Sequence, residues 1–325
     1  MFILINKKRI LDIVDKRDFE TKIGENLKTG TVKELAENGV KFVLFGVEES
    51  VGPKANLGNS GSEKAWESFI KSFVNIQQNE FMDVSKIGVL GSFKFETEEF
   101  KLDSLRAQIN KIDKELAPVV ESIGNHGMIP ILIGGGHNNS YPLITGLCKA
   151  YGDSLNVINC DPHADFRPLE GRHSGNGFSY AMSEDALNKY FILGLHQNYN
   201  GKSIFKMFEE ANIEETKVLY TFFDNWIYGK STLEKDLEIG IKFVKGKYVG
   251  IELDMDSIAY MPSSACGPSG IDLNNARKYI SECASNLNVA YLHLPEAAPE
   301  NKKQIKIVGK SLSYLVSDFI KTSLK

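Results

Sequence analysis

The segment 155–165 reads LNVINCDPHAD, a mostly apolar run that ends in three polar side chains. Nearly continuous hydrophobicity, rather than alternation, is typical of a strand that is buried on both faces of a parallel sheet. In extended backbone, residues i, i+2 and i+4 face the same way, so we expect Asp161, His163 and Asp165 to converge on one point. The segment therefore predicts a parallel sheet with a polar site at the end of one strand.

Similar short apolar runs recur along the chain. They occupy residues 41–47, 86–91, 128–134, 191–196, 217–223, 248–254 and 288–294. Several connecting segments, such as 102–116 and 308–320, carry apolar residues at helical spacing. Strands that alternate with helices form right-handed crossovers, and the helices then cover the sheet. We therefore expect one α/β domain over residues 1–325, with three α/β/α layers around a parallel sheet of about eight strands.

The composition excludes several classes of protein. Of the 325 residues, 42% are hydrophobic and 25% are charged, which is the profile of a globular protein rather than a disordered chain or a coiled coil. The formal charge of −4 gives no basic field for nucleic acid or anionic membrane. The start of the chain, MFILINKKRI, does not have the charge order of an export signal, and its four cysteines show no CxxC spacing. We expect a cytoplasmic protein that binds neither nucleic acid nor membrane.

Two further strands are expected to end in polar motifs. Residues 134–137 read GGGH, and residues 254–256 read DMD. Because function gathers at the carboxyl ends of parallel strands, two imidazoles and four carboxylates should meet at one edge of the sheet. Taken singly, each motif could also be a turn or an exposed loop. Together they would bury four like charges, which requires neutralising cations, and six N and O ligands suit two metal ions with shared ligands. The candidate ligands are His137, Asp161, His163, Asp165, Asp254 and Asp256.

The type of ligand bears on the metal. No cysteine lies in these motifs, which argues against a thiolate-rich zinc or iron–sulfur site. Carboxylates with two histidines favour Mn²⁺, and Fe²⁺, Co²⁺, Ni²⁺ and Zn²⁺ stay open as alternatives.

The order GGGH, DPHAD, DMD resembles the ureohydrolase superfamily, which comprises arginases, agmatinases and formimidoylglutamases. The resemblance covers roughly residues 40–320. It implies an arginase-like fold, a homo-oligomer, and hydrolysis of the C–N bond of an amidine or guanidine by two Mn²⁺ ions held by the six residues above. It also implies that Asp165 accepts or relays the proton of a bridging water, and that Glu296, in a Glu-x-x-Pro context, faces the amidine. His173 follows the metal loop and is the candidate that protonates the departing nitrogen, although a locally bonded loop histidine is the alternative. We expect His126 and His293 to be structural.

The arginines bear on the substrate. Only six arginines occur in the chain, and Arg167 and Arg172 lie close to the metal motif. A planar guanidinium suits the capture of a carboxylate, although either arginine could instead brace a ligand. Arginases typically have Asn where this chain has Arg167, and GGGH replaces the GGDH that is usual in arginases and agmatinases. Candidate substrate-binding residues are therefore Arg167, Arg172, Asn176, Lys54 and Asn56.

These departures make the chain most similar to formimidoylglutamases. The expected reaction is hydrolysis of N-formimidoyl-L-glutamate to L-glutamate and formamide. Alternatives are an arginase, an agmatinase or another guanidino-acid hydrolase that releases urea, a deacetylase of similar fold, and a non-catalytic descendant. The loop 262–270, which contains Cys266, follows DMD and could wall the pocket.

Overall fold

One mixed sheet runs through the computed structural model, which describes residues 1–97 and 99–324. The strand order is β1-β4-β3-β5-β10-β9-β6-β7-β8, and β2 pairs with β4. All of these pairs are parallel except β1 with β4. The strands are β1 (Phe2–Leu4), β2 (Lys28–Thr29), β3 (Phe42–Glu48), β4 (Ile87–Lys94), β5 (Ile129–Ile133), β6 (Leu155–Cys160), β7 (Leu187–Leu195), β8 (Val218–Phe222), β9 (Val249–Leu253) and β10 (Val289–Leu294).

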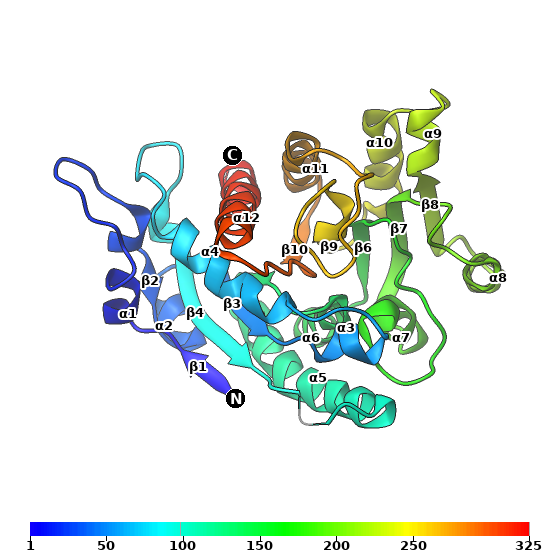
Figure 1. The fold of residues 1–325 in the computed structure, drawn as a ribbon, viewed down its shortest axis with the longest axis horizontal. Helices are drawn as coiled ribbons and strands as arrows, with labels where there is room; N and C mark the ends of the chain where they lie inside the picture. The colour runs from blue at the N-terminus through cyan, green and yellow to red at the C-terminus, as the bar shows by residue number, and fades with distance from the viewer. Residues whose placement is uncertain (98, 325) are drawn as a thin grey trace.

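Helices cover both faces of the sheet, which gives the three layers of an α/β/α fold (Figure 1). One face is covered by α4 (Ala65–Phe73), α10 (Leu233–Val244), α11 (Leu273–Asn286) and α12 (Lys302–Ser323). The other face is covered by α2 (Val32–Glu37), α5 (Leu102–Asn125), α6 (Ser140–Tyr151), α7 (Gly177–Ser183) and α8 (Lys202–Ala211). The short helices α1 (Lys7–Leu11), α3 (Val51–Ala55) and α9 (Phe223–Ile227) complete the set in the described residues.

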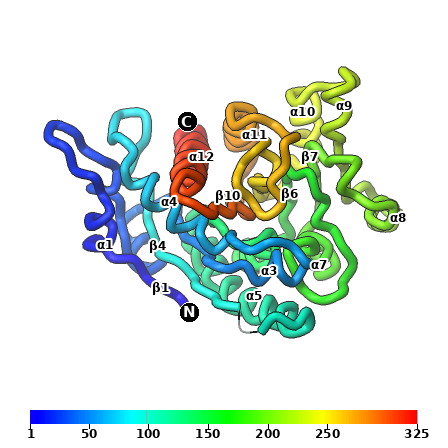
Figure 2. The backbone as a smooth tube through the Cα atoms, viewed as in Figure 1, coloured from blue at the N-terminus to red at the C-terminus, as the bar shows by residue number. Residues whose placement is uncertain are grey.

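Each helical layer buries its own hydrophobic cluster against the sheet. Phe69 of α4, Tyr279 of α11 and Leu312 of α12 belong to one cluster, and Ile109 of α5 and Leu143 of α6 belong to the other. The last helix, α12, packs beside α4, so segments from opposite ends of the chain meet on one face (Figure 2). None of the helices in the described part of the chain has both the length and the apolar character needed to cross a bilayer.

The prediction of a three-layer α/β/α fold around a mostly parallel sheet is confirmed. All eight predicted runs form strands, with β7 beginning at Leu187 rather than at Phe191. The structure adds β1 and β2 beside β4, and both differ from the predicted type of strand. β2 has only two residues, and β1 is an antiparallel strand in which Phe2 and Leu4 are exposed. The sequence signal of a buried parallel strand is therefore absent from both.

The four central strands position the site. β5 and β6 are consecutive in the chain, but β10 and β9 lie between them in the sheet. The carboxyl ends of these strands are in register, since Ile133 pairs with Leu294 and Cys160 pairs with Leu253. Ligands bind in such sheets where the strand order changes, beyond the carboxyl ends of the strands. The loops that carry GGGH, DPHAD, DMD and Glu296 all leave from these four neighbouring strand ends.

Candidate metal centre and adjoining pocket

A glycine turn delivers His137 to the centre. Gly134 and Gly135 have φ of +81° and +68°, which is the left-handed region that glycine adopts without steric cost. A side chain at Gly135 would also collide with the Asn139 amide, 2.4 Å from the position of its Cβ. His137 then begins a 3₁₀ turn that leads into α6, and its side chain is completely buried.

Three aspartates face one nitrogen of His137. Its Nδ1 lies 3.2 Å from Oδ2 of Asp161, 2.9 Å from Oδ2 of Asp165 and 3.0 Å from Oδ2 of Asp254. These four side chains form a group whose ligand atoms all lie within 4.8 Å of one another. They come from the ends of β5, β6 and β9, so strands far apart in sequence build one compact set of donors.

The donor set fits a divalent metal ion. Around one six-coordinate ion with bonds of about 2.1 Å, neighbouring ligand atoms lie about 3.0 Å apart. The distances from His137 Nδ1 to the aspartates span 2.9–3.2 Å, and both ring nitrogens of His137 are buried without a hydrogen-bond partner among the described residues. Imidazole and carboxylate groups suit Mn²⁺ and related ions. The residues present therefore fit a metal ion.

His163 and Asp256 lie beside this group. The Nδ1 atom of His163 is 3.5 Å from Oδ1 of Asp161 and 3.9 Å from Oδ2 of Asp256. The His163 side chain is 30% exposed, and its ring stacks on Tyr199 with 5.2 Å between the ring centroids. Two candidate ligands thus adjoin Asp161 on the solvent side of the buried group.

The local geometry differs from the expected extended backbone. Asp161 accepts a hydrogen bond on Oδ1 from the amide of His163 at 2.7 Å, and Asp254 accepts one from the amide of Asp256 at the same distance. Asp165 has φ of +44°. The chain therefore turns directly after each strand, and the first aspartate of each motif keeps Oδ2 for His137. The side chains converge as expected, but a turn brings them together rather than strand pleating.

The electrostatics of the group follow from burying like charges together. Burial, then the charges of Asp256 and Asp161, raise the pKa of Asp254 well above its usual range. Burial and Asp161 also raise the pKa of Asp165. Burial alone would lower the pKa of His163, but Asp161 and Asp256 outweigh it and raise that pKa to about 10. The group thus tolerates its negative charge only with protons or other cations nearby.

A cavity of about 510 Å³ opens onto this group. Its floor and walls include His163, Asp165, Asp254, Asp256, Glu296 and Arg167. Ser264 and Ala265 of the loop 262–270 also line it. That loop therefore forms part of the pocket wall, and Cys266 within it is an exposed free cysteine.

Glu296 presents one oxygen to this region. Its Oε1 accepts a hydrogen bond from the His137 amide at 2.7 Å, and its Oε2 is buried without a hydrogen-bond partner in the described residues. The residue has φ of +67°, and its own amide donates to the Gly135 carbonyl at 2.9 Å. Burial, then the nearby charge of Asp256, raise the pKa of Glu296 to about 8. A cation beside Oε2 would favour the ionised form of this buried carboxyl group, so the position is suited to a cationic ligand.

The candidate substrate residues divide into two groups. Arg167 and Asn56 line the cavity. The Arg167 side chain is 48% exposed, and its Nη2 and Nε lie 2.8 and 3.0 Å from Oε1 of Glu170, which also lines the cavity. Lys54 lies elsewhere, since its Nζ donates to Thr97 at 3.0 Å. Arg167 is therefore the candidate substrate residue that brings a positive charge to the cavity.

Arg172 and Asn176 differ from the expectation of a substrate contact. Arg172 is buried, with its Nε 3.0 Å from Oδ2 of Asp113, and its guanidinium lies against the ring of Tyr141. Asn176 accepts on Oδ1 from Arg172 at 2.9 Å, and it is completely buried. Neither residue lines the cavity. Sequence proximity suggested a contact, but the partner of Arg172 is Asp113, which lies on α5 far away in the sequence.

His173 is also buried behind the wall rather than in it. Its Nδ1 accepts from the Gly175 amide at 3.1 Å, so the neutral ring carries its proton on Nε2, which lies 3.2 Å from Oε1 of Glu170. Burial lowers the pKa of His173 to about 4. The ring is therefore neutral near pH 7 and in contact with Glu170, and this geometry favours the local, hydrogen-bonded alternative over a direct proton donor.

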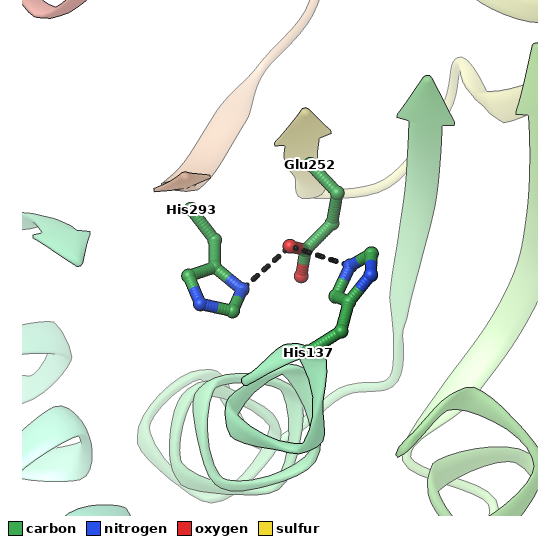
Figure 3. Close-up of side chains that lie close together, drawn as sticks. All are labelled: His137, Glu252 and His293. Atoms are coloured by element: carbon green, nitrogen blue, oxygen red, sulfur yellow. Dashed lines mark hydrogen bonds and ion pairs between the residues drawn. The ribbon is translucent and has the colours of Figure 1, made fainter. Parts of the chain in front are cut away.

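Sequence reasoning missed a buried carboxylate behind His137. Glu252 lies inside β9, and it contacts both His137 and His293 (Figure 3). Its signal was a glutamate within the apolar run YVGIELD, where a charged side chain requires a buried partner.

Known proteins resemble this chain in sequence. The model of the arginase family matches residues 40–318. The formimidoylglutamase of Geobacillus sp. (strain WCH70) is 27% identical over 305 residues, covering 87% of this chain and 84% of the relative. The formimidoylglutamase of Macrococcus caseolyticus is 24% identical over 278 residues, covering 84% of this chain and 83% of the relative.

Solved structures share the fold. Formimidoylglutamase from Bacillus subtilis has a TM-score of 0.77 at 18% identity, covering 94% of this chain and 93% of that one. Trypanosoma cruzi formiminoglutamase with Mn²⁺ has a TM-score of 0.75 at 18% identity, covering 93% of this chain and 98% of that one. Since the family model covers most of the sequence, and since the fold and the motif order agree with it, the chain belongs to the arginase family.

Proposed function

We propose that this chain hydrolyses N-formimidoyl-L-glutamate to L-glutamate and formamide with two bound Mn²⁺ ions. The observation that carries the proposal is one cavity lined by Glu296, by Arg167 and by Asp165 and Asp254 of the metal-type donor set. The names of the curated relatives support the choice of substrate. The proposal includes a cytoplasmic homo-oligomer that acts in histidine breakdown.

The proposed metal ligands fall into two neighbouring sets. His137, Asp161, Asp165 and Asp254 form the buried set, and His163 and Asp256 adjoin it through Asp161. Two divalent ions held by these residues would supply Lewis acidity and a water-derived nucleophile near neutral pH.

Asp165 and Glu296 act on the water and the substrate. Asp165 lines the cavity, and its pKa is raised by burial and by Asp161, so it is suited to accept a proton from the attacking water and to pass it to the departing nitrogen. Glu296 uses Oε1 to accept the His137 amide, which leaves Oε2 to pair with an N–H of the planar amidinium. The cation and the carboxylate neutralise each other, so the amidine carbon is held at the metal-facing end of the cavity.

Arg167 binds the carboxylate end of the proposed substrate. Glu170 engages Nε and Nη2 of the guanidinium, which fixes its direction and leaves further N–H donors for a substrate carboxylate. His173 contacts the same Oε1 of Glu170, so we assign it to support of this wall rather than to proton donation. A dicarboxylate with an amidine group matches this arrangement of charges, whereas agmatine would bring a second cation towards Arg167.

The test is a substrate panel on Mn²⁺-loaded protein. N-formimidoyl-L-glutamate, arginine, agmatine and guanidinobutyrate are compared, with formamide and urea scored separately. Formamide from the first compound alone is expected. Urea from arginine would contradict the assigned substrate and would leave the metal chemistry in place.

A matched arginine variant isolates the role of Arg167. Arg167→Ala is expected to raise KM for the dicarboxylate by at least ~10-fold, since a charge-assisted contact contributes about 1.5–3 kcal/mol. Arg277→Ala serves as the control, because Arg277 pairs with Asp318 on α12 and not with the cavity. Equal KM values in the two variants would contradict the assignment.

A further inference from the structure

Glu252 is a buried charged side chain next to the candidate metal ligands. It lies on β9 directly opposite His293 of β10, and both side chains are completely buried. A carboxylate in such a place is stable only when donors satisfy its oxygens. The identity of those donors therefore indicates what the group does.

Three side chains surround the Glu252 carboxylate. The Tyr291 hydroxyl donates to Oε1 at 2.7 Å, and His293 Nδ1 lies 2.7 Å from Oε2. Nε2 of His137 lies 3.4 Å from the same Oε2 as an ion-pair contact, and this nitrogen is buried without a hydrogen-bond partner among the described residues (Figure 3). The figure shows the carboxylate between the two imidazoles, with His137 reaching it from the start of α6. Glu252 on β9 thus contacts both the neighbouring strand β10 and His137, which precedes α6.

The two nitrogens of His137 face different groups. Nδ1 faces the three aspartates, whereas Nε2 faces Glu252. A nitrogen that binds a metal must offer a lone pair, so the ring then carries its proton on the other nitrogen. An acceptor beside Nε2 stabilises this tautomer and holds the ring plane towards the metal.

We infer that Glu252 is a positioning residue that holds His137 in the Nε2–H form and directs Nδ1 at the metal. This inference rests on the proposed role of His137 as a metal ligand and not on the choice of substrate. Tyr291 and His293 satisfy the remaining capacity of the carboxylate, which lets it stay ionised in the core. His293 therefore acts on the centre through Glu252, in addition to its part in the core.

A third metal ion between His137, Glu252 and His293 is the competing explanation, since their ligand atoms also lie within 4.8 Å of one another. The distance of 2.7 Å from His293 Nδ1 to Glu252 Oε2 is that of a charge-assisted hydrogen bond. It is shorter than the ~3.0 Å that separates neighbouring ligand atoms around one ion with bonds of about 2.1 Å. The spacing therefore favours a hydrogen bond between His293 and Glu252 over a shared metal ion.

The test is metal affinity in Glu252→Gln, measured by competition with a fluorescent chelator for Mn²⁺. Loss of the carboxylate beside Nε2 is expected to weaken Mn²⁺ binding at the site that contains His137 by ~10–100-fold. Tyr291→Phe is the matched control, because it removes a 2.7 Å hydrogen bond from the other oxygen of the same carboxylate. We expect the control to change Mn²⁺ affinity by less than ~3-fold, since it leaves Oε2 in place.

A second measurement needs no variant. Nitrogen NMR of Zn²⁺-loaded, histidine-labelled protein is expected to show His137 bound through Nδ1, with a proton on Nε2 shifted downfield by the carboxylate. Zinc bound through Nε2 would overturn the inference even if Glu252→Gln does not fold.

The metal stoichiometry separates the two proposals. Wild-type protein that binds no metal would refute the metal centre itself. Two ions bound with equal affinity in wild type and Glu252→Gln would refute only the positioning role. A third ion that disappears in Glu252→Gln would show that Glu252 is a metal ligand and would overturn its positioning role.

Discussion

The ion pair between Arg172 and Asp113 gives a sharp test of what Arg172 does. Its Nε and Nη2 lie 3.0 and 3.4 Å from the two carboxylate oxygens, and the two side chains are only 2% and 7% exposed. Asp113→Asn removes the counter-charge and leaves the guanidinium in the core. Breaking a buried pair from one side costs about 3–5 kcal/mol.

The remaining contacts set the magnitude within that range. Asn176 Oδ1 and the Asn138 carbonyl still accept from Arg172 at 2.9 Å, and the rings of Tyr141 and Tyr180 still flank it. Each cation–π contact contributes about 0.5–2 kcal/mol, so the isolated cation is partly stabilised. We therefore expect Asp113→Asn to lower the free energy of unfolding by about 3 kcal/mol, at the lower end for a buried pair.

A double variant tests the same reasoning from the other side. Burial raises the pKa of Asp113 to about 6 although Arg172 opposes the rise, so the pair is costly to bury. Replacing both partners by apolar groups avoids that cost. Asp113→Leu with Arg172→Met is therefore expected to be less destabilised than Asp113→Asn alone.

Urea unfolding of metal-loaded protein, followed by tryptophan fluorescence, measures these effects. Asp318→Asn is the control, because it breaks the partly exposed pair with Arg277 and should cost less than about 1 kcal/mol. A decrease in the free energy of unfolding of less than about 1 kcal/mol in Asp113→Asn would refute the reasoning about the buried pair. A large rise in KM for Arg172→Met at unchanged stability would instead restore a substrate contact for Arg172.

Three further predictions concern the centre and its wall. Glu296→Gln keeps the size of the side chain but removes the charge that pairs with the amidinium. We therefore expect kcat/KM to fall at least ~10²-fold while the Mn²⁺ stoichiometry stays unchanged. Equal kcat/KM in the variant and the wild type would contradict the role of Oε2. Removal of metal by a chelator should lower Tm by several degrees in a scan and readdition should restore it, because the aspartates facing His137 then repel one another; an unchanged Tm would contradict the donor set. Burial lowers the pKa of His173 to about 4. Between about pH 6.5 and 4, the unfolded chain therefore binds a proton at this residue that the folded chain does not bind. The free energy of unfolding falls as the pH drops through that window. After allowance for screening at the pocket wall, His173→Gln should lessen that fall by about 1 kcal/mol at pH 5 in urea unfolding, and an identical pH dependence would contradict it.

The strands and the metal motifs could be predicted because each leaves a local pattern. A strand buried on both faces must be apolar throughout, and a ligand cluster at its end must be polar, so the boundary between them is visible within ten residues, as in 155–165. The edge strand β1 could not be recognised in this way, since its three residues are partly exposed and pair antiparallel.

The pocket wall could not be predicted because it depends on partners from remote segments. Arg167 and Arg172 look equivalent in sequence, yet Glu170 directs one along the cavity and Asp113, on α5, holds the other in the core. His173 likewise owes its state to burial and to Glu170. Charge near a motif thus indicates a site, whereas the direction of each side chain requires the tertiary contacts.

The insertion of β10 and β9 between β5 and β6 has a consequence for how the protein is made. The middle of the sheet is synthesised last, so the two flanking groups of strands leave the ribosome before the strands that join them. Such contacts between residues distant in sequence form slowly. A nascent chain that ends before Glu296 lacks the β10 loop, and one that ends before Asp254 lacks one of the three aspartates that face His137. The full donor set therefore exists only after β9 and the loop that follows it have been made, so metal binding at this centre must follow synthesis of a central strand.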